Sequence, residues 1–345
     1  MTTVYATDSR FADHEFTGYS HPEHPGRVQA VWELLEATKI VNDLHHLQPT
    51  PVATDVLRLA HSDELIDQLA QISRQDRLVL IDHDTYALPE SYEIARLAVG
   101  AAVQATEAVL NQQAKNGLVV VRPPGHHATI NRAMGFCLLN NIAVAARVAQ
   151  RVHQVERILI VDFDVHHGNG TQDIFYNDPG VYFISTHQSP FYPGTGYIDQ
   201  TGIGAGDGYT LNIPMPGGQG DENYAAVFDE IIYPAAKRYQ PELIMVSAGF
   251  DAHWVDPLAN MKLSLMGFAQ LTRKLVRMAE EFCGGKIVFV MEGGYDLQAL
   301  SHGILNVGYA LLGQDEVSDP YGPAKGQEPD ISKLIEQIKG IHDLA

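Results

Sequence analysis

The sequence repeats one pattern four times: a run of aliphatic residues, then a loop with glycine or proline that carries polar side chains. The four segments are G-L-V-V-V-R-P-P-G-H-H at 117–127, R-I-L-I-V-D-F-D-V-H-H at 157–167, E-L-I-M-V-S-A-G-F-D at 242–251 and K-I-V-F-V-M-E-G-G-Y at 286–295. Runs that are apolar on both faces are typical of strands buried inside a parallel sheet. The pattern therefore restricts the chain to folds in which both faces of a sheet are covered.

Helix-length segments lie between the predicted strands, at 91–113, 222–239 and 264–281. This alternation predicts an α/β fold with a doubly wound, mostly parallel sheet and right-handed crossovers. Such sheets bind ligands outside the carboxyl ends of their strands, where all four polar clusters fall. Because no repeat or long linker divides the chain, we predict one domain over 1–345. Its segment from about 315 to 345, rich in proline, glycine and acid before a short amphipathic helix, is predicted to be a surface appendage.

The charge and the termini limit the partners and the location. The 42 acidic and 23 basic residues give a net charge of −19, which disfavours direct nucleic-acid binding and attracts small cations, although acidity can equally serve solubility alone. The two cysteines, Cys137 and Cys283, suggest no disulfide framework and suit a reducing compartment. The N-terminus lacks a signal-peptide pattern, and no apolar run reaches the ~20 residues that cross a bilayer. We predict a cytoplasmic protein without a membrane partner.

The segment D-F-D-V-H-H is the first candidate site. Strand alternation places Asp162, Asp164 and His166 on one face and His167 on the other, where we interpret His167 as structural. Oxygen and imidazole donors together suit zinc or a neighbouring transition metal. An aspartate at a strand end can also cap the next helix, but three ionisable groups are costly to bury for packing alone.

Asp251, which also follows a buried strand, is the best candidate for a third ligand. A turn-capping role is the alternative, and it remains open for Asp256 in the following loop. Asp164, His166 and Asp251 would give one zinc three protein ligands and an open position, which is typical of a catalytic site.

Histidines and a tyrosine complete the predicted chemistry. His126 and His127 follow a stiff Pro-Pro turn and could divide the roles of base and acid. The His45-His46 pair lacks a strand-end context, and we assign it to the surface. Tyr295, after two glycines, could donate to the oxyanion of a tetrahedral intermediate, although a packed core tyrosine is the alternative.

Five motifs in order, from roughly residue 20 to 305, resemble the zinc-dependent histone deacetylases and acetylpolyamine amidohydrolases, in a class II-like, bacterial-type form. These are P-P-G-H-H-A, D-F-D-V-H-H-G-N-G-T, P-F-Y-P-G-T-G, S-A-G-F-D-A-H-W-V-D-P-L and E-G-G-Y. The resemblance implies the arginase–deacetylase fold, with a parallel sheet of about eight strands between helices. It also implies removal of an acetyl or similar acyl group from a primary amine, as in acetyl-lysine or an acetylpolyamine, with release of acetate.

The resemblance further implies residue roles. One catalytic zinc per chain would have three ligands: Asp164, His166 and Asp251. His127 would be the general base and later the acid, and His126, oriented by Asp162, its electrostatic partner. Tyr295 would polarise the amide carbonyl. Substrate contacts would come from five residues: Gly135 and Phe136 on one tunnel wall, Tyr192 on the facing wall, Gly293 in the turn before Tyr295, and Asp84 at the rim. A structural potassium would bind the backbone carbonyls of Asp162, Asp164 and His166 together with Ser185 and Thr186.

Three positions depart from the commonest family pattern. Asn169 stands where class I members carry an acid, and since it cannot stabilise imidazolium by charge, we expect His127 to stay neutral and act as a base. Tyr192 replaces a commoner phenylalanine. His24, in H-P-E-H-P-G-R, occupies a position often taken by arginine, which leaves any anion or acetate-exit role there open.

Two other functions compete with this interpretation. A dinuclear manganese ureohydrolase needs further bridging carboxylates, and Asn169 and His253 stand where they would be supplied. A non-catalytic acetyl-amine binding protein predicts loss of His127 or Tyr295, and both are present. The expected partner is a small acetylated amine or an acetyl-lysine protein, and a homo-oligomer is compatible with the sequence.

Overall fold

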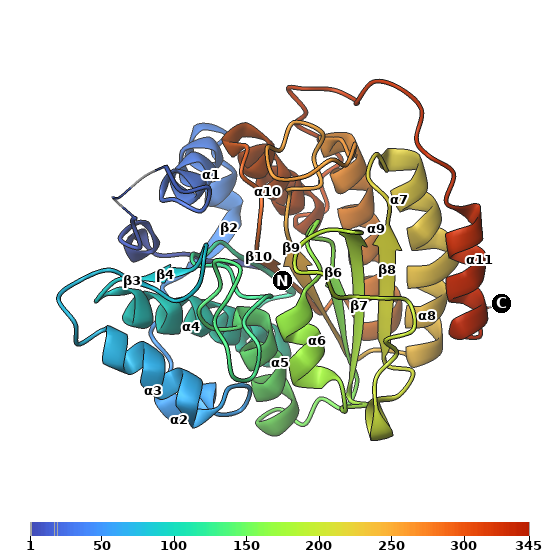
Figure 1. Ribbon diagram of the computed structural model, residues 1–345. Helices are drawn as coiled ribbons and strands as arrows, with labels where there is room; N and C mark the ends of the chain where they lie inside the picture. Colours follow the sequence, from blue (N-terminus) through green and yellow to red (C-terminus); the bar gives the residue numbers. More distant parts are fainter. Residues whose placement is uncertain (1, 17, 19, 345) are drawn as a thin grey trace.

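The computed structural model describes residues 2–16, 18 and 20–344. Within them, eight parallel strands form one sheet in the order β2-β1-β5-β10-β9-β6-β7-β8, and a short antiparallel pair, β3 with β4, lies outside it (Figure 1). The strands are β1 (Thr3–Ala6), β2 (Leu44–Leu47), β3 (Val79–Leu80), β4 (Tyr86–Ala87), β5 (Asn116–Val119), β6 (Ile158–Asp162), β7 (Val181–Gln188), β8 (Thr210–Met215), β9 (Leu243–Ala248) and β10 (Ile287–Met291).

Helices cover both faces of this sheet (Figure 1). One layer contains α2 (Thr54–Leu57), α3 (Asp63–Ile72), α4 (Ser91–Leu110), α5 (Asn141–Arg151) and α6 (Asn169–Phe175). The other contains α1 (Gly26–Ala37), α7 (Asp221–Val227), α8 (Tyr233–Tyr239), α9 (Leu265–Cys283) and α10 (Leu297–Leu311). The predicted α/β fold, a doubly wound parallel sheet between helices, is confirmed.

The four predicted strands form the centre of the sheet as β5, β10, β9 and β6, and every residue in them is buried. Helices on both sides remove these side chains from water, which is why the sequence runs are apolar on both faces. At roughly 25 cal/mol per Å² of apolar surface, this burial is the main favourable contribution to folding.

The predicted helices occur with local differences. The segment at 264–281 forms α9, whose first turn is capped by the Ser264 hydroxyl and which ends at Cys283, followed by Gly284 with φ of 64°. The segment at 222–239 is not one α-helix, because a π-helical turn, Phe228–Ile232, separates α7 from α8, and Pro234 is the second residue of α8. Proline lacks the N–H that a continuous α-helix would use at that point. His45 and His46 are exposed as predicted, although they lie on the edge strand β2.

The C-terminal segment crosses the surface and ends in α11 (Ser332–Ile341), which lies beside α8 at the edge of the molecule (Figure 1). Ile335 and Ile338 are buried on its inner face, as an amphipathic helix requires. The single domain over 1–345 stays a prediction, and residues 1 and 345 lie outside the described part. In that part, no helix has the length and apolar character needed to cross a bilayer.

Candidate active site

Three metal-ligating side chains meet at the carboxyl ends of β6 and β9. Asp164, His166 and Asp251 each offer a ligand atom within 4.8 Å of the others, and all three are buried. Nδ1 of His166 lies 3.2 Å from Oδ1 of Asp164 and 3.1 Å from Oδ2 of Asp251. The three residues predicted as ligands therefore form one compact cluster.

The turn after β6, rather than strand alternation, brings these ligands together. The strand ends at Asp162, so the predicted alternation does not extend to Asp164 and His166. The Asp164 N–H donates to Asp162 Oδ1 at 3.1 Å, and the His166 N–H to Asp164 Oδ1 at 2.9 Å. The Val165 N–H donates to Asp251 Oδ1 at 2.8 Å, which joins this turn to the loop after β9.

Gly293 lies directly behind the cluster. Its N–H donates to Asp164 Oδ2 at 2.8 Å, and a Cβ here would lie 2.2 Å from Asp251 Oδ2. Only glycine allows the backbone to approach the two carboxylates so closely. Gly293 thus supports the ligands from behind, and it is not among the described residues that line the cavity beside them.

The donor set and its spacing fit a single zinc ion. Tetrahedral ligands about 2.0 Å from zinc lie roughly 3.3 Å apart, close to the His166 distances given above. Burial raises the pKa of Asp251 and the neighbouring Asp164 charge raises it further, so two carboxylates here call for a cation between them. Burial lowers the pKa of His166, but its contacts with Asp164 and Asp251 raise that pKa to about 10.

The histidine pair, His126 and His127, lies beside this cluster, with ring centroids 4.0 Å apart. Nδ1 of His126 lies 3.0 Å from Asp162 Oδ2, and Nδ1 of His127 lies 2.7 Å from Asn169 Oδ1. The Asn169 amide donates to the His127 carbonyl and to Met134 Sδ, which directs its oxygen toward the ring. His127 Nδ1 must therefore carry a hydrogen, which leaves Nε2 as the basic nitrogen.

The two rings have opposite tendencies to bind a proton. Burial lowers the pKa of His127 well below its usual value, and the adjacent His126 and His166 lower it further. Burial also lowers the pKa of His126, but Asp164 and Asp162 raise it to about 10. The site thus places a charged His126 beside a neutral His127.

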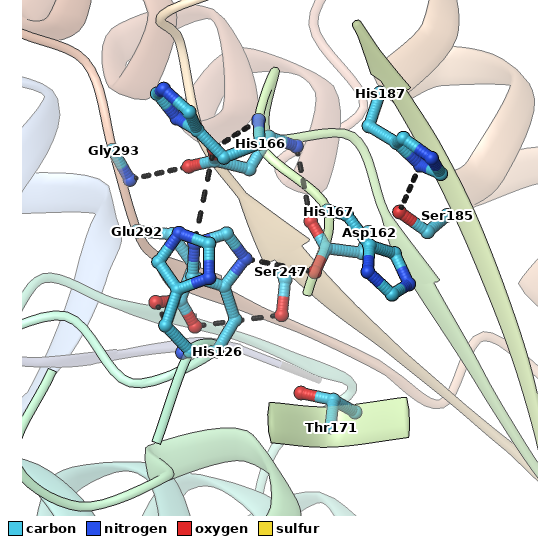
Figure 2. Close-up of polar contacts among 12 residues, drawn as sticks. His126, Asp162, His166, His167, Thr171, Ser185, His187, Ser247, Glu292 and Gly293 are labelled. Carbon is cyan, nitrogen blue, oxygen red and sulfur yellow. Dashed lines mark hydrogen bonds and ion pairs between the residues drawn. The ribbon is translucent and has the colours of Figure 1, made fainter. Parts of the chain in front are cut away.

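Glu292, which the sequence interpretation missed, holds the turn that carries the pair (Figure 2). Its Oε2 accepts the Gly125 N–H at 2.7 Å and the His126 N–H at 3.2 Å, and Ser247 Oγ lies 3.4 Å from Oε1. Burial raises the pKa of Glu292 to about 7. Its place directly after a buried strand is the signal that also marked Asp162.

Arg27 is the second residue that was missed. Its guanidinium lies 5.0 Å from the centroid of the Tyr295 ring, and it donates to the carbonyls of Gly294 and Glu292. Burial raises the pKa of Tyr295 well above its usual value although Arg27 lowers it, so the phenol stays protonated and can donate. His24, which the sequence singled out, accepts the Gly26 N–H in a local turn instead.

A cavity of about 270 Å³ joins these groups to solvent. It is lined by Pro22, Asp84, His127, Gly135, Phe136, His166, Phe191, Tyr192, Leu258 and Tyr295. Four residues predicted to contact substrate, Asp84, Gly135, Phe136 and Tyr192, are among these lining residues, whereas Pro22, Phe191 and Leu258 were not predicted. Gly135, with φ of 56°, takes a left-handed conformation in which a Cβ would lie 2.4 Å from the His127 ring. A larger cavity of about 800 Å³ lies at the amino ends of β7 and β8, and none of the predicted site residues lines it.

The remaining predicted residues lie beneath the site. Ser185 Oγ is 3.0 Å from Nδ1 of His187 (Figure 2), and Thr186 Oγ1 donates to the Asp162 carbonyl at 3.4 Å. Both lie near the predicted potassium carbonyls, and the potassium site stays a prediction. His167 Nδ1 lies 2.7 Å from Thr195 Oγ1, so this histidine supports the loop that carries Tyr192.

The groups at this edge of the sheet are those of a hydrolase of the deacetylase class: a cluster with metal-ligand chemistry, a histidine pair and a phenol around one narrow cavity. The histone deacetylase domain family matches residues 21–311, and the chain belongs to this family. Histone deacetylase 14, chloroplastic, from Arabidopsis thaliana is 39% identical over 94% of this chain and 82% of its own length. A probable deacetylase from Archaeoglobus fulgidus is 40% identical over 99% of this chain and 98% of its own.

A solved structure agrees with these sequence relatives. The crystal structure of the HDA15 HD domain superposes with a TM-score of 0.90 at 35% identity, and the match covers 99% of this chain and 94% of that chain. The family and the fold inferred from the five sequence motifs are both confirmed.

Proposed function

We propose that the protein is a zinc-dependent deacetylase that removes acetyl, or a similar acyl group, from a primary amine and releases acetate. The observation that carries the proposal is that His127, His166 of the ligand cluster and the Tyr295 phenol line the same narrow cavity. Asp164, His166 and Asp251 would hold the zinc. When bound there, zinc would act as a Lewis acid on the acyl carbonyl and make a water molecule more acidic.

The chain's own residues would move the protons. His127 Nε2 takes a proton from water as the water oxygen attacks the acyl carbon, and His126 with Asp162 balances the local charge. The Tyr295 hydroxyl donates to the oxygen that becomes negative in the tetrahedral intermediate. His127 then gives its proton to the departing nitrogen as the C–N bond breaks, which yields the amine and acetic acid. At neutral pH the acid gives its proton to the amine, so the released products are acetate and an ammonium ion.

The cavity supports an extended acyl-amine substrate. Phe136 and Tyr192 line the cavity together with Asp84, whose carboxylate could accept N–H donors from the substrate. Acetyl-lysine in a protein and an acetylpolyamine both have the required chain and remain alternative substrates. A structural potassium near Ser185, Thr186 and the Asp162 carbonyl forms part of the same proposal.

A dinuclear manganese enzyme is disfavoured by what occupies the second-metal positions. Asn169 Oδ1 faces His127 Nδ1, and His253 Nδ1 accepts the Val255 N–H in its own turn. Among the described residues, one cluster alone has metal-ligand spacing.

Acetate release from acetyl-lysine peptides and from acetylated polyamines, assayed side by side, tests the function and the substrate together. Tyr295→Phe should keep its metal yet lose on the order of 10²–10³-fold in turnover, since one oxyanion donor is removed. Metal analysis of both proteins is the control. Near-wild-type turnover of the variant, or two manganese ions per chain, would contradict the proposal.

A further inference from the structure

Asp256 connects two loops of the site through one buried carboxylate. Its Oδ2 accepts the Tyr295 N–H at 2.7 Å and the Asp296 N–H at 3.3 Å. Its Oδ1 accepts the Leu258 N–H at 2.9 Å, and the residue is 6% exposed. Hydrogen bonds from N–H groups to a buried carboxylate are charge-assisted and stronger than neutral ones.

The peptide unit between Gly294 and Tyr295 is held at both of its edges. Its carbonyl, that of Gly294, accepts from Arg27 Nε at 2.8 Å, and its N–H, that of Tyr295, donates to Asp256. Because a peptide is planar, holding both of its edges fixes the direction of the Tyr295 N–Cα bond. The next peptide is held through the Asp296 N–H by the same carboxylate, and with both peptides held the Tyr295 Cα–Cβ bond has a fixed direction. Gly294, at φ of 117°, cannot hold this orientation by itself, since glycine samples a wide range of φ and ψ.

Other contacts hold the loop on either side of the Tyr295 N–H. After it, Asp296 Oδ1 accepts the Ala299 N–H and the Tyr321 hydroxyl. The Gly293 N–H donates to Asp164, and the Gly293 carbonyl accepts the Phe250 N–H at 3.1 Å. Asp256 is thus the one described side chain that accepts the Tyr295 N–H, and it comes from the loop that also carries Leu258 of the cavity wall.

We propose that Asp256 is a positioning residue for the reaction: it sets the orientation of the Gly294–Tyr295 peptide and thereby directs the Tyr295 phenol at the acyl oxygen. The inference rests on the proposed function, in which Tyr295 is the donor. It goes beyond a turn cap, because a cap would stabilise the loop without contributing to turnover.

A double-mutant cycle separates positioning from stability. Wild type, Asp256→Ala, Tyr295→Phe and the double variant are compared for kcat, KM, bound metal and Tm. Asp256→Ala should lower kcat by about 10–100-fold and leave KM within about twofold, because a small misplacement of the donor is costly in the transition state. In the Tyr295→Phe background the same change should lower kcat by less than about threefold, since the donor is already absent.

Asp256→Asn keeps one oxygen acceptor and serves as the milder variant. Its kcat should fall between those of wild type and Asp256→Ala. If the alanine variant does not fold, Asp256→Asn replaces it in the double-mutant cycle. The matched control is Asp221→Ala. The Asp221 carboxylate accepts the Ser264 N–H at 2.8 Å and the Ser264 hydroxyl at 2.6 Å, and Asp221 does not line the active-site cavity. This control should lower Tm and leave kcat unchanged.

Three results would overturn the inference, and they are distinguishable. In the first, Asp256→Ala lowers kcat equally in the wild-type and Tyr295→Phe backgrounds. In the second, Asp256→Ala is fully active while Tyr295→Phe is inactive. Either result would leave the proposed function intact and would exclude the positioning role of Asp256. Wild-type turnover of Tyr295→Phe would instead remove the donor role of Tyr295 and this inference with it.

Discussion

At the scale of single residues, the acid–base chemistry depends on what lies beside each histidine nitrogen. His126 has the carboxylate of Asp162 at Nδ1, whereas His127 has the amide oxygen of Asn169. A carboxylate favours imidazolium, and an amide does not supply the same charge. Burial and the charge of His126 keep the pKa of His127 low, and Asn169, unlike an aspartate, adds no negative charge that would oppose them.

Asn169→Asp tests this assignment. The new carboxylate should raise the pKa of His127, so a larger fraction of the ring is protonated near neutral pH and cannot accept a proton. The acidic limb of the kcat/KM profile should then move to higher pH, which a series of buffers measures. Met134→Leu, which removes only the sulfur that accepts from Asn169, should leave that limb in place. An unchanged profile in Asn169→Asp would contradict the assignment of His127 as the base.

Individual residues also show what the sequence could predict. Asp164, His166, Asp251, His126, His127 and Tyr295 were found because each follows a buried run or lies in a motif. Arg27 and Glu292 were not, although Glu292 had the same strand-end signal as Asp162. Arg27 lies on α1, 265 or more residues from the carbonyls it contacts, and no local pattern records such a pairing.

At the scale of elements, the apolar runs predicted which segments are strands, but they predicted less well the residue at which each strand ends. All four central strands were found, but the assumption that β6 continues past Asp162 was wrong. Backbone N–H groups of 164–166 bind carboxylates instead of a neighbouring strand, and sequence alternation cannot reveal this change. The π-helical turn before Pro234 was likewise hidden within one apparent helix.

The loop after β7 offers an element-level prediction. Thr195 joins the Tyr192-bearing loop to His167 beneath it. Thr195→Val keeps the side-chain shape but removes this hydrogen bond, so the tunnel wall should become less ordered. We expect KM to rise by about 3–10-fold with kcat changed less, since a lost hydrogen bond is worth about 1 kcal/mol. Steady-state kinetics measure this split.

Thr201→Val is the matched control for that loop. Thr201 donates to Asp207 at 2.8 Å at the far end of the same segment, away from the cavity. The KM of Thr201→Val should match that of the wild-type protein. Equal changes in KM for both variants would show that the loop responds as a whole, and that His167 has no particular role in it.

At the scale of the whole molecule, the ligand cluster links folding to metal binding. Asp164 and Asp251 are buried side by side, and a cation bound between them would offset their repulsion in the folded chain and not in the unfolded chain. Removing the metal with a chelator should lower Tm by several degrees, because a ligand at about 1,000 times its Kd contributes about 4 kcal/mol.

Calorimetry with and without chelator measures this shift, and readdition of zinc should restore Tm. Asp251→Ala, which lacks one ligand, is the control and should show little response to either treatment. A wild-type Tm that is insensitive to chelation would contradict a metal held by these residues.

The order of strands has a consequence for how the chain is made. β10 is the last strand in sequence, yet it lies in the middle of the sheet, between β5 and β9. During synthesis, the edges of β5 and β9 that pair with β10 therefore stay unpaired until about residue 291 has left the ribosome. Unpaired edges recruit other chains. A polypeptide that stops before β10 thus lacks both Tyr295 and the central strand, and it is expected to aggregate rather than to form a smaller folded protein.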